Sequence, residues 1–385
     1  MDFPLVWAEI DLDAISHNVR VLSHMTQPGV RLMAVVKADA YGHGATHVAK
    51  AALDAGADFL GVARLHEALE LRSAGFTSPI LIFGYTPPEM AGDLIAGGIS
   101  QTVYSMVAAE ALSAAAVSAG KPLKVHLKVD TGMGRLGLMP RSTKFADESV
   151  TGNRALEEAV AISKLPGIEL EGVFTHFATA DSPNTSFTRT QFDVFIEFLG
   201  SLARQGVTVP LRHAANSAAI INQPDTHLDM VRAGIAMYGL SPFGGDVSVP
   251  ADLRPAMTLK ARVVHVKDVP AGFKVSYGST FSAPRPTTIA TVPIGYADGY
   301  NRGLSSRGNM LVRGHRAPIA GRVCMDLTML DVGHIPGISV GDEVVIFGRQ
   351  QDACISVDEI AAILDTINYE VVSTLTRRVK RVYRG

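Results

Sequence analysis

Short apolar runs alternate with amphipathic stretches through the first 240 residues. Eight runs have the length and composition of buried strands: 32–36, 59–62, 80–83, 101–104, 125–129, 172–176, 211–214 and 231–235. Stretches with helical periodicity lie between most of them, for example 46–55, 66–74, 108–119, 156–164 and 189–205. Eight strands with helical crossovers in roughly 210 residues predict a closed (β/α)8 TIM-type barrel, an α/β fold, rather than an open doubly wound sheet.

The pattern changes after residue 240. Short β-rich runs separated by Gly, Pro and Asp follow, at 259–269, 288–293, 310–312, 317–324, 328–332 and 343–347. One late helix is expected at 360–367, opened by a capping box of Ser356 and Glu359. A further strand, 6–12, precedes the first helix. Since eight strands already fill the barrel, we expect this strand to join the C-terminal region. The predicted domains are a barrel at 11–240 and a mostly β domain at 241–385 joined by residues 1–10.

Composition narrows the class of protein. Hydrophobic residues make up 47% of the 385 residues and charged residues 19%, which is typical of a soluble enzyme with a large core. A net charge of −2 without a basic tract argues against a nucleic-acid partner. We expect a cytoplasmic protein with no membrane contact, because neither a leader pattern nor a spanning apolar run is present. Cys324 and Cys354 are too few for a disulfide framework or a zinc cluster, so no metal is expected.

Charged and polar side chains occupy the ends of the predicted barrel strands. Lys37 ends the first strand and is followed by a turn at 41–44 that we expect to be flexible. A lysine there is costly unless it is exposed, paired or used in chemistry. The same strand end also supplies Tyr41, and the other strand ends supply Lys128, Arg135, His176, Asp181, Asn216, Ser217, Arg232, Gly234 and Ile235. Barrel enzymes carry their catalytic residues at this face, and the surplus of positive charge predicts an anionic ligand.

The last two strands suggest what the anion is. The Ser217 hydroxyl and the backbone near Gly234 predict a phosphate site, at the position where barrels often bind phosphate. A lysine facing such a site fits a Schiff base with substrate or with pyridoxal phosphate. Taken singly, His176 could be a core histidine, and Arg135 or Arg232 a surface ion pair. Their coincidence at one face favours the functional interpretation.

Nine segments together decide between these possibilities. In order along the chain they read AVVKADAYGHGA, HLKVDTGMGRLG, HFATAD, AANSAA, MVRAGIAMYGL, VSYGSTF, PIGYADGY, GRVCMD and INYEVV. The chain resembles the alanine racemases across almost its whole length. The resemblance implies a pyridoxal-phosphate barrel followed by a β domain, in a homodimer with shared active sites. It also implies interconversion of L-alanine and D-alanine, which supplies D-alanine for peptidoglycan.

The same resemblance assigns roles within the barrel. Lys37 would hold the cofactor as an imine, and Arg232 would meet its ring nitrogen. Because the guanidinium does not transfer a proton to the ring nitrogen, that nitrogen stays unprotonated and the cofactor withdraws electrons less strongly, which suits racemisation. His176 would lie near the ring and hydrogen-bond the second catalytic group. The phosphate would be held by Tyr41, Ser217, the Gly234 and Ile235 backbone, and Tyr369.

Racemisation removes a proton from one face of Cα and returns one to the other, so one base on each face is the simplest arrangement. The resemblance implies Lys37 for one face and Tyr277 of the partner subunit for the other. Arg135 and the Met325 backbone would bind the substrate carboxylate. Supporting positions are Tyr296, Arg302, Arg322, Asp181 and Tyr369 along a substrate corridor, and Asp326 beside the second catalytic arm.

Two further residues stay open. Lys128 would clash with Arg135 unless it is carbamylated, as in some relatives, or offset by a carboxylate such as Asp130. Cys324 is interpreted as packing, and Cys354 has no assigned role.

Two rival functions fit parts of the pattern. A basic amino acid decarboxylase on the same scaffold would profit from a stronger electron sink than Arg232 allows. A non-catalytic pyridoxal-phosphate carrier would end near residue 240 and would lack the segment 275–281. The racemase is therefore the favoured prediction.

Overall fold

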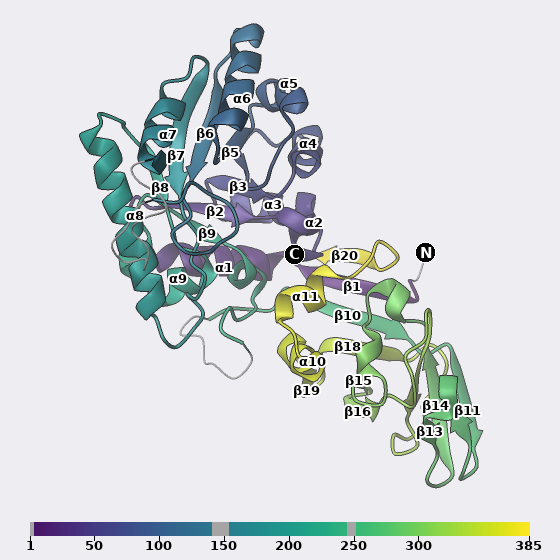
Figure 1. Ribbon diagram of the computed structural model, residues 1–385. Helices are drawn as coiled ribbons and strands as arrows, with labels where there is room; N and C mark the ends of the chain where they lie inside the picture. The colour runs from purple at the N-terminus through teal and green to yellow at the C-terminus, as the bar shows by residue number, and fades with distance from the viewer. Residues whose placement is uncertain (1–3, 141–153, 245–251) are drawn as a thin grey trace.

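The computed structural model describes residues 4–140, 154–244 and 252–385, and it shows a barrel joined to a β-rich region (Figure 1). Eight parallel strands pair in the order β8-β7-β6-β5-β4-β3-β2-β9. The edge strands meet, because Asp229 N–H donates to Arg212 O at 3.1 Å and Arg232 N–H to Ala215 O at 3.1 Å. The strands are β2 (Arg31–Val35), β3 (Phe59–Val62), β4 (Ile80–Ile82), β5 (Ser100–Val103), β6 (Leu123–Lys128), β7 (Ile168–Phe174), β8 (Leu211–His213) and β9 (Met230–Ala233). The predicted TIM-type barrel is confirmed.

Helices surround this barrel (Figure 1). They are α1 (Leu12–His24), α3 (Ala45–Asp54), α4 (Leu65–Ser73), α5 (Ala91–Gly97), α6 (Met106–Ala119), α7 (Arg154–Ser163), α8 (Ser186–Arg204) and α9 (Ser217–Asn222). Their apolar faces pack on strands that are buried on both sides, which explains the near-continuous hydrophobic runs. The pattern missed α5 and α9, because helices of 7 and 6 residues show too few turns for a clear period.

The C-terminal region contains the predicted β structure. A seven-stranded sheet has the order β16-β15-β18-β10-β1-β20, with β19 paired to β18. β1 (Val6–Asp11) lies between β10 (Met257–Arg262) and β20 (Lys380–Arg384), so both chain ends belong to this sheet. The domain boundary near residue 240 stays a prediction. The other strands of this sheet are β15 (Asn309–Val312), β16 (His315–Pro318), β18 (Glu343–Gln350) and β19 (Ala353–Ile355).

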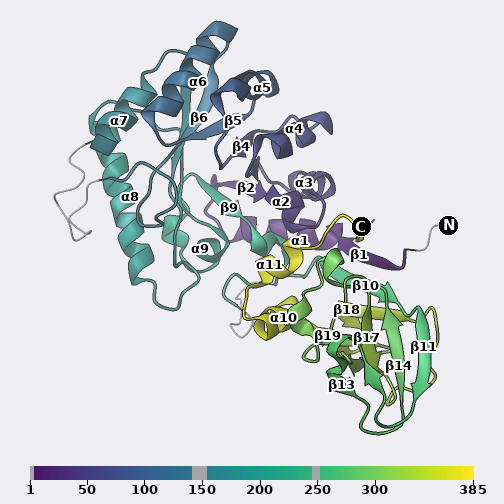
Figure 2. The same cartoon turned by 45° about the vertical axis from the view of Figure 1, so that its right-hand side comes forward.

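Two smaller sheets complete this region, and Figure 2 shows them at its end away from the barrel. One joins β11 (His265–Val269), β14 (Thr287–Val292) and β17 (Thr328–Asp331); the other is the hairpin β12 (Lys274–Val275) and β13 (Phe281–Ser282). The predicted strand at 259–269 was wrong as one unit, since the chain changes sheet between Arg262 and His265. The predicted strand at 317–324 ends at Pro318, where pairing with β15 stops.

Two helices lie in the C-terminal region. α10 (Val357–Leu364) begins at Ser356, whose side chain accepts from Glu359 N–H, so the capping signal was correct. It ends before Asp365, which has a left-handed conformation, so the last residues of the predicted helix, up to Ile367, lie outside the observed one. α11 (Asn368–Ser373) was not predicted. It lies beside the turn after β2 and brings Tyr369 to the barrel.

Candidate active site

The turn that carries Lys37 has an unusual backbone that distant residues contact. Directly after β2, α2 (Lys37–Tyr41) has left-handed backbone at Ala38, Asp39, Ala40 and Tyr41, with φ between 51° and 54°. Left-handed conformations cost non-glycine residues roughly 1–2 kcal/mol each, so the surroundings must hold the turn. Ala38 N–H donates to Glu67 Oε1 at 2.6 Å, and Ala45 N–H donates to Asp39 Oδ1 at 2.8 Å.

The C-terminal region also braces this turn. Arg381 Nε donates to the Gly42 carbonyl at 2.9 Å, and a Cβ on Gly42, whose φ is 81°, would lie 2.3 Å from the Val372 carbonyl oxygen. Glycine at this position is therefore needed for both conformation and space. The flexibility expected for this turn stays a prediction, and the sequence around it does not reveal these distant contacts.

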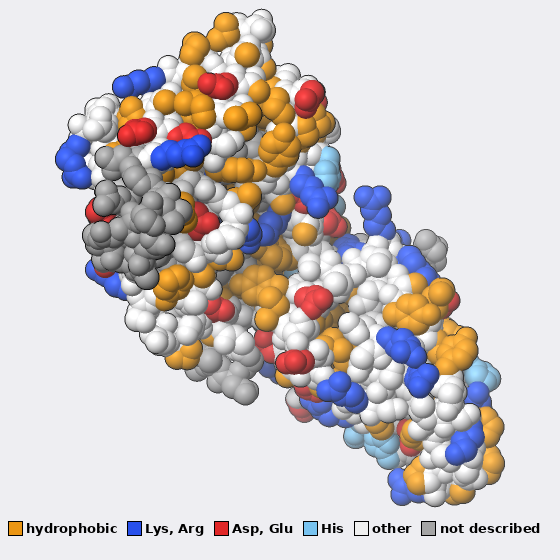
Figure 3. Space-filling view, viewed as in Figure 1, with side chains coloured by type: hydrophobic (Ala, Val, Ile, Leu, Met, Phe, Trp, Pro, Cys, Tyr) orange, Lys and Arg blue, Asp and Glu red, His pale blue; other side chains and the backbone are white. Residues whose placement is uncertain are grey.

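Lys37 faces a cavity of about 340 Å³ at the C-terminal ends of the barrel strands. Burial, chiefly, and the Arg135 charge lower the pKa of Lys37, while Glu67 opposes them. The cavity brings together most of the predicted barrel residues, and basic side chains gather beside the hollow next to the β region (Figure 3). Its predicted lining residues are Lys37, Tyr41, Lys128, Arg135, His176, Asn216, Ser217, Arg232, Gly234, Ile235 and Tyr369.

One end of the cavity has the features of an oxyanion cradle. Ser217 Oγ accepts from Gly234 N–H at 2.9 Å and from Ala236 N–H at 3.3 Å. A Cβ on Gly234 would lie 3.1 Å from Tyr41 Oη and 3.5 Å from Ser217 Oγ, so this glycine keeps the space between the two hydroxyls open. Burial raises the pKa of Tyr41, which keeps its hydroxyl protonated and able to donate. The Tyr369 ring lies 6.0 Å from the Tyr41 ring.

Arg232 is held rigidly at the other end. One of its terminal nitrogens, Nη2, donates to Thr175 O at 2.9 Å and to Ala214 O at 2.8 Å. Burial, with a smaller effect of Arg135, lowers the pKa of Arg232 to about 9, so the guanidinium stays charged near neutrality. Nη2 also lies 3.2 Å from His176 Nδ1. Burial and the surrounding cations lower the pKa of His176 well below its usual range, so the ring is neutral and Nδ1 accepts.

Lys128 is buried without a hydrogen-bond partner for Nζ among the described residues. Its ammonium position lies 4.7 Å from the centre of the Phe174 ring. Burial first, then Arg232 and Arg135, lower the pKa of Lys128 well below its usual range. Asp130 acts on it only through space, because its carboxylate accepts the backbone N–H groups of Gly132, Met133, Gly134 and Arg135.

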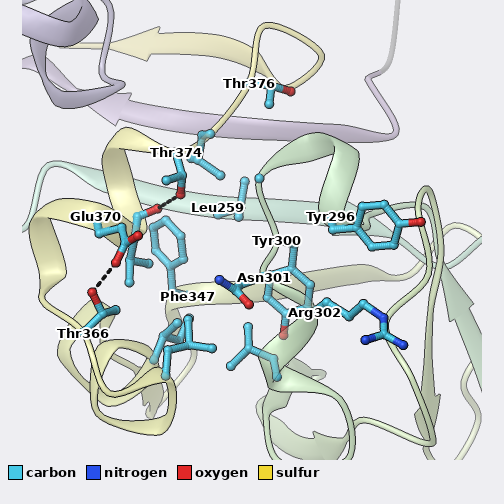
Figure 4. Close-up of a pocket in the computed structure, with 16 residues that line it drawn as sticks. Leu259, Tyr296, Tyr300, Asn301, Arg302, Phe347, Thr366, Glu370, Thr374 and Thr376 are labelled. Carbon is cyan, nitrogen blue, oxygen red and sulfur yellow. Dashed lines mark hydrogen bonds between the residues drawn. The ribbon is translucent and has the colours of Figure 1, made fainter.

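The remaining predicted residues lie elsewhere. Tyr277, Met325 and Asp326 line a separate surface pocket of about 400 Å³ beside Cys324. Tyr277 is 71% exposed and opens η4 (Tyr277–Ser279), next to the β12–β13 hairpin. Tyr296 lines a third cavity, of about 380 Å³, with Arg302 of η6 (Arg302–Leu304); both side chains lie at its edge in Figure 4.

Sequence reasoning missed three residues that shape the site. Glu67 and Arg381 hold the Lys37 turn, and Phe174 packs under both Lys128 and Arg232. Phe174 lies in the predicted strand 172–176, but the sequence pattern assigned its ring no role. Nothing local marks Glu67 or Arg381, because each meets the turn only through the fold.

A barrel with a lysine, a cradle for an anion and a buried arginine in one cavity defines a barrel enzyme acting on an anionic ligand or cofactor. The family model "Alanine racemase, N-terminal domain" matches residues 10–242, and "Alanine racemase, C-terminal domain" matches residues 256–383. The chain belongs to the alanine racemase family.

Individual relatives agree over the whole length. An alanine racemase of Desulfosudis oleivorans is 55% identical over 98% of this chain and 96% of its own. The alanine racemase of Streptomyces lavendulae has a crystal structure that matches with a TM-score of 0.92 at 42% identity, covering 100% and 98% of the two chains. The Bacillus anthracis alanine racemase with bound L-Ala-P matches with a TM-score of 0.91 at 39% identity, covering 100% and 96%.

The structure contains no helix, within the described ranges, that is long and apolar enough to cross a membrane.

Proposed function

We propose that this protein interconverts L-alanine and D-alanine with pyridoxal phosphate as cofactor, and that it supplies D-alanine for peptidoglycan. The observation that carries the proposal is Lys37, whose pKa is lowered and which shares one cavity with the Ser217–Gly234 cradle and the buried Arg232. The cytoplasmic location stays a prediction from composition.

The residues present fit the cofactor. The opening that Gly234 keeps between Tyr41 and Ser217 would take its phosphate, with the Ile235 backbone and Tyr369 beside it. Arg232 would face the ring nitrogen, and Lys37 would be the attachment point. When bound, pyridoxal phosphate withdraws electrons from the amino acid attached to it and so acidifies the Cα hydrogen.

Two protein groups would move the proton. A lysine with a lowered pKa is available as a neutral amine, so Lys37 can accept a proton from one face of Cα. The opposite face needs a second base, and a tyrosine phenol is the group that we propose for it. His176 is neutral and uses Nδ1 as an acceptor, which leaves Nε2–H to donate to a phenol oxygen. We assign that phenol to Tyr277 of the partner subunit.

The exposure of Tyr277 supports a homodimer with shared sites. An aromatic residue 71% exposed beside Met325, itself 53% exposed, is suited to insertion into a second copy of the chain. In that arrangement the Met325 backbone and Arg135 would hold the substrate carboxylate, and Asp326 and Tyr296 would lie near the entrance. A site completed in this way is inactive in the monomer.

We also infer that Lys128 is carbamylated. A neutral amine reacts with carbon dioxide, and the lowered pKa of Lys128 favours that form. The resulting anion would lie between Arg135 and Arg232. The Asp130 carboxylate does not take this place, because it accepts backbone N–H groups of its own loop.

Incubation with L-alanine in D₂O tests the function. A racemase incorporates deuterium at Cα while D-alanine appears, whereas a decarboxylase releases carbon dioxide and a carrier does neither. Complementation of a D-alanine-requiring bacterium tests the link to peptidoglycan. Absence of D-alanine with fully loaded enzyme would contradict the proposal.

A further inference from the structure

A line of buried polar groups runs from Arg232 through the barrel to its opposite end. Arg232 Nη1 lies 2.9 Å from His213 Nδ1, His213 Nε2 lies 2.9 Å from His126 Nδ1, and His126 Nε2 lies 3.0 Å from Glu171 Oε2. Both histidines are fully buried, and neither has a role in the proposed function.

The hydrogen-bond directions along this line are set by its two ends, the Arg232 guanidinium, which only donates, and the Glu171 carboxylate, which only accepts. A guanidinium only donates, so His213 Nδ1 accepts, and the neutral ring must carry its proton on Nε2. His213 Nε2–H therefore donates to His126 Nδ1, and His126 Nε2–H donates to Glu171. Only in this tautomer does each ring nitrogen face a partner of the opposite hydrogen-bonding kind. Burial lowers the pKa of both histidines, which keeps them neutral.

The Glu171 carboxylate accepts hydrogen bonds from three side chains, and it stays ionised. Ser100 Oγ donates to its Oε2 at 2.5 Å, and Lys124 Nζ donates to its Oε1 at 2.9 Å. Burial raises the pKa of Glu171, but the hydrogen bonds from His126, Ser100 and Lys124 outweigh burial and hold it at about 2. The Lys124 side chain is 49% exposed, so the line ends at the surface away from the cavity.

The barrel makes room for the line at one glycine. Gly172 on β7 pairs with His126 on β6 and with Leu211 on β8, the strand that carries His213. A Cβ at this position would lie 2.5 Å from His126 Nδ1 and 2.6 Å from its Cε1. Since real Cβ contacts of this length do not occur, only glycine lets the His126 ring pass over β7 to reach His213.

We propose that Glu171 is a positioning residue for Arg232, acting by fixing the tautomers of His126 and His213. With Glu171 in place, an acceptor always faces Arg232 Nη1. Without it, His213 can place its proton on Nδ1, which sets a donor against a donor and displaces the guanidinium from its place in the cavity. The inference rests on the proposed function for its kinetic consequences, but the tautomers belong to the apoprotein.

Three variants separate an acceptor role from a packing role. Glu171→Met removes the acceptor at similar size, whereas Glu171→Gln keeps one carbonyl oxygen that His126 can reach. Glu169→Met is the matched control, because Glu169 is an exposed glutamate on the same strand. Loss of a group that orients a metal-bound histidine typically lowers activity about 10- to 100-fold, and by analogy we expect kcat of Glu171→Met to fall about tenfold with an unchanged KM for alanine. Glu171→Gln should recover most of this loss, and Glu169→Met should equal the wild type.

Ring-nitrogen NMR of the 15N-histidine-labelled apoprotein gives the independent readout. The His213 ring is recognised by its contact with Phe174, on which it stacks at 4.8 Å. We expect Nε2–H tautomers for both rings in the wild type and a mixture in Glu171→Met. A proton on His213 Nδ1 in the wild type would overturn the inference without any variant, even if Glu171→Met does not fold. A Glu171→Met enzyme with unchanged tautomers and kcat would also overturn it. A wild type that does not racemise alanine would instead contradict the proposed function.

Discussion

The barrel cavity and the surface around Tyr277 differ in almost every physical respect. The cavity is lined by basic side chains and held by hydrogen bonds, with Arg232 4% exposed. The Tyr277 surface is open, and Tyr277, Met325 and Leu327 are all large exposed side chains. The hydrogen bonds of the cavity arrange its side chains before a ligand binds, whereas exposed apolar side chains are typical of an interface. The difference supports our proposal that the chain carries two halves of a site that meet between copies.

The largest effect is expected from removing the amine of the cavity. Lys37→Ala should lower racemisation at least about 10⁴-fold, because both cofactor attachment and one base are lost. The visible absorbance of bound cofactor should vanish with it. Lys50→Ala is the control, since Lys50 is an exposed lysine on α3 paired with Asp54. Activity of Lys37→Ala would show that this cavity is not the active site.

The next effect concerns the exposed surface. Tyr277→Phe removes only the hydroxyl, and we expect a fall in kcat of about 10³-fold with normal cofactor absorbance. Tyr85→Phe, at a tyrosine 58% exposed on the barrel, should change nothing. Racemisation is measured by the appearance of D-alanine. Full activity of Tyr277→Phe would mean that the second base is another group.

Mixing the two inactive variants tests whether the halves meet between chains. A dimer of one Lys37→Ala and one Tyr277→Phe chain has one site with both residues intact. Equal mixing should therefore restore about a quarter of wild-type activity per chain if subunits exchange freely. Exchange is followed by native mass spectrometry with one chain isotopically labelled. Hybrid dimers without activity would place Tyr277 and Lys37 of the same chain in one site.

The smallest effect is expected at Lys128. Lys128→Met keeps the size of the side chain but cannot carry a carbamate, so Arg135 loses its predicted anionic neighbour. We expect kcat/KM to fall about tenfold, as for loss of a charge-assisted contact. Lys121→Met, at an exposed lysine just before β6, is the control. A 13C NMR signal from 13C-bicarbonate that is present in the wild type and absent from Lys128→Met would identify the carbamate; its absence from the wild type would contradict this modification.

The sequence alone determined the barrel and the cavity residues that its strands deliver. Buried parallel strands need continuous apolar runs, and their carboxyl ends meet at one face, so Lys37, Arg135, Ser217 and Arg232 could be placed together before any coordinates. The short helices and the strand at 259–269 were less predictable, because brief segments lack a clear period and sheet changes leave no local mark.

Only the tertiary structure decided how that cavity is held. The left-handed turn after Lys37 depends on Glu67 from the next crossover and on Arg381 from the last strand. The line from Arg232 to Glu171 joins residues on four strands and passes over Gly172, whose backbone conformation is ordinary. Such contacts join residues that are far apart in the sequence and depend on which strands become neighbours. A local pattern of residues therefore does not predict them.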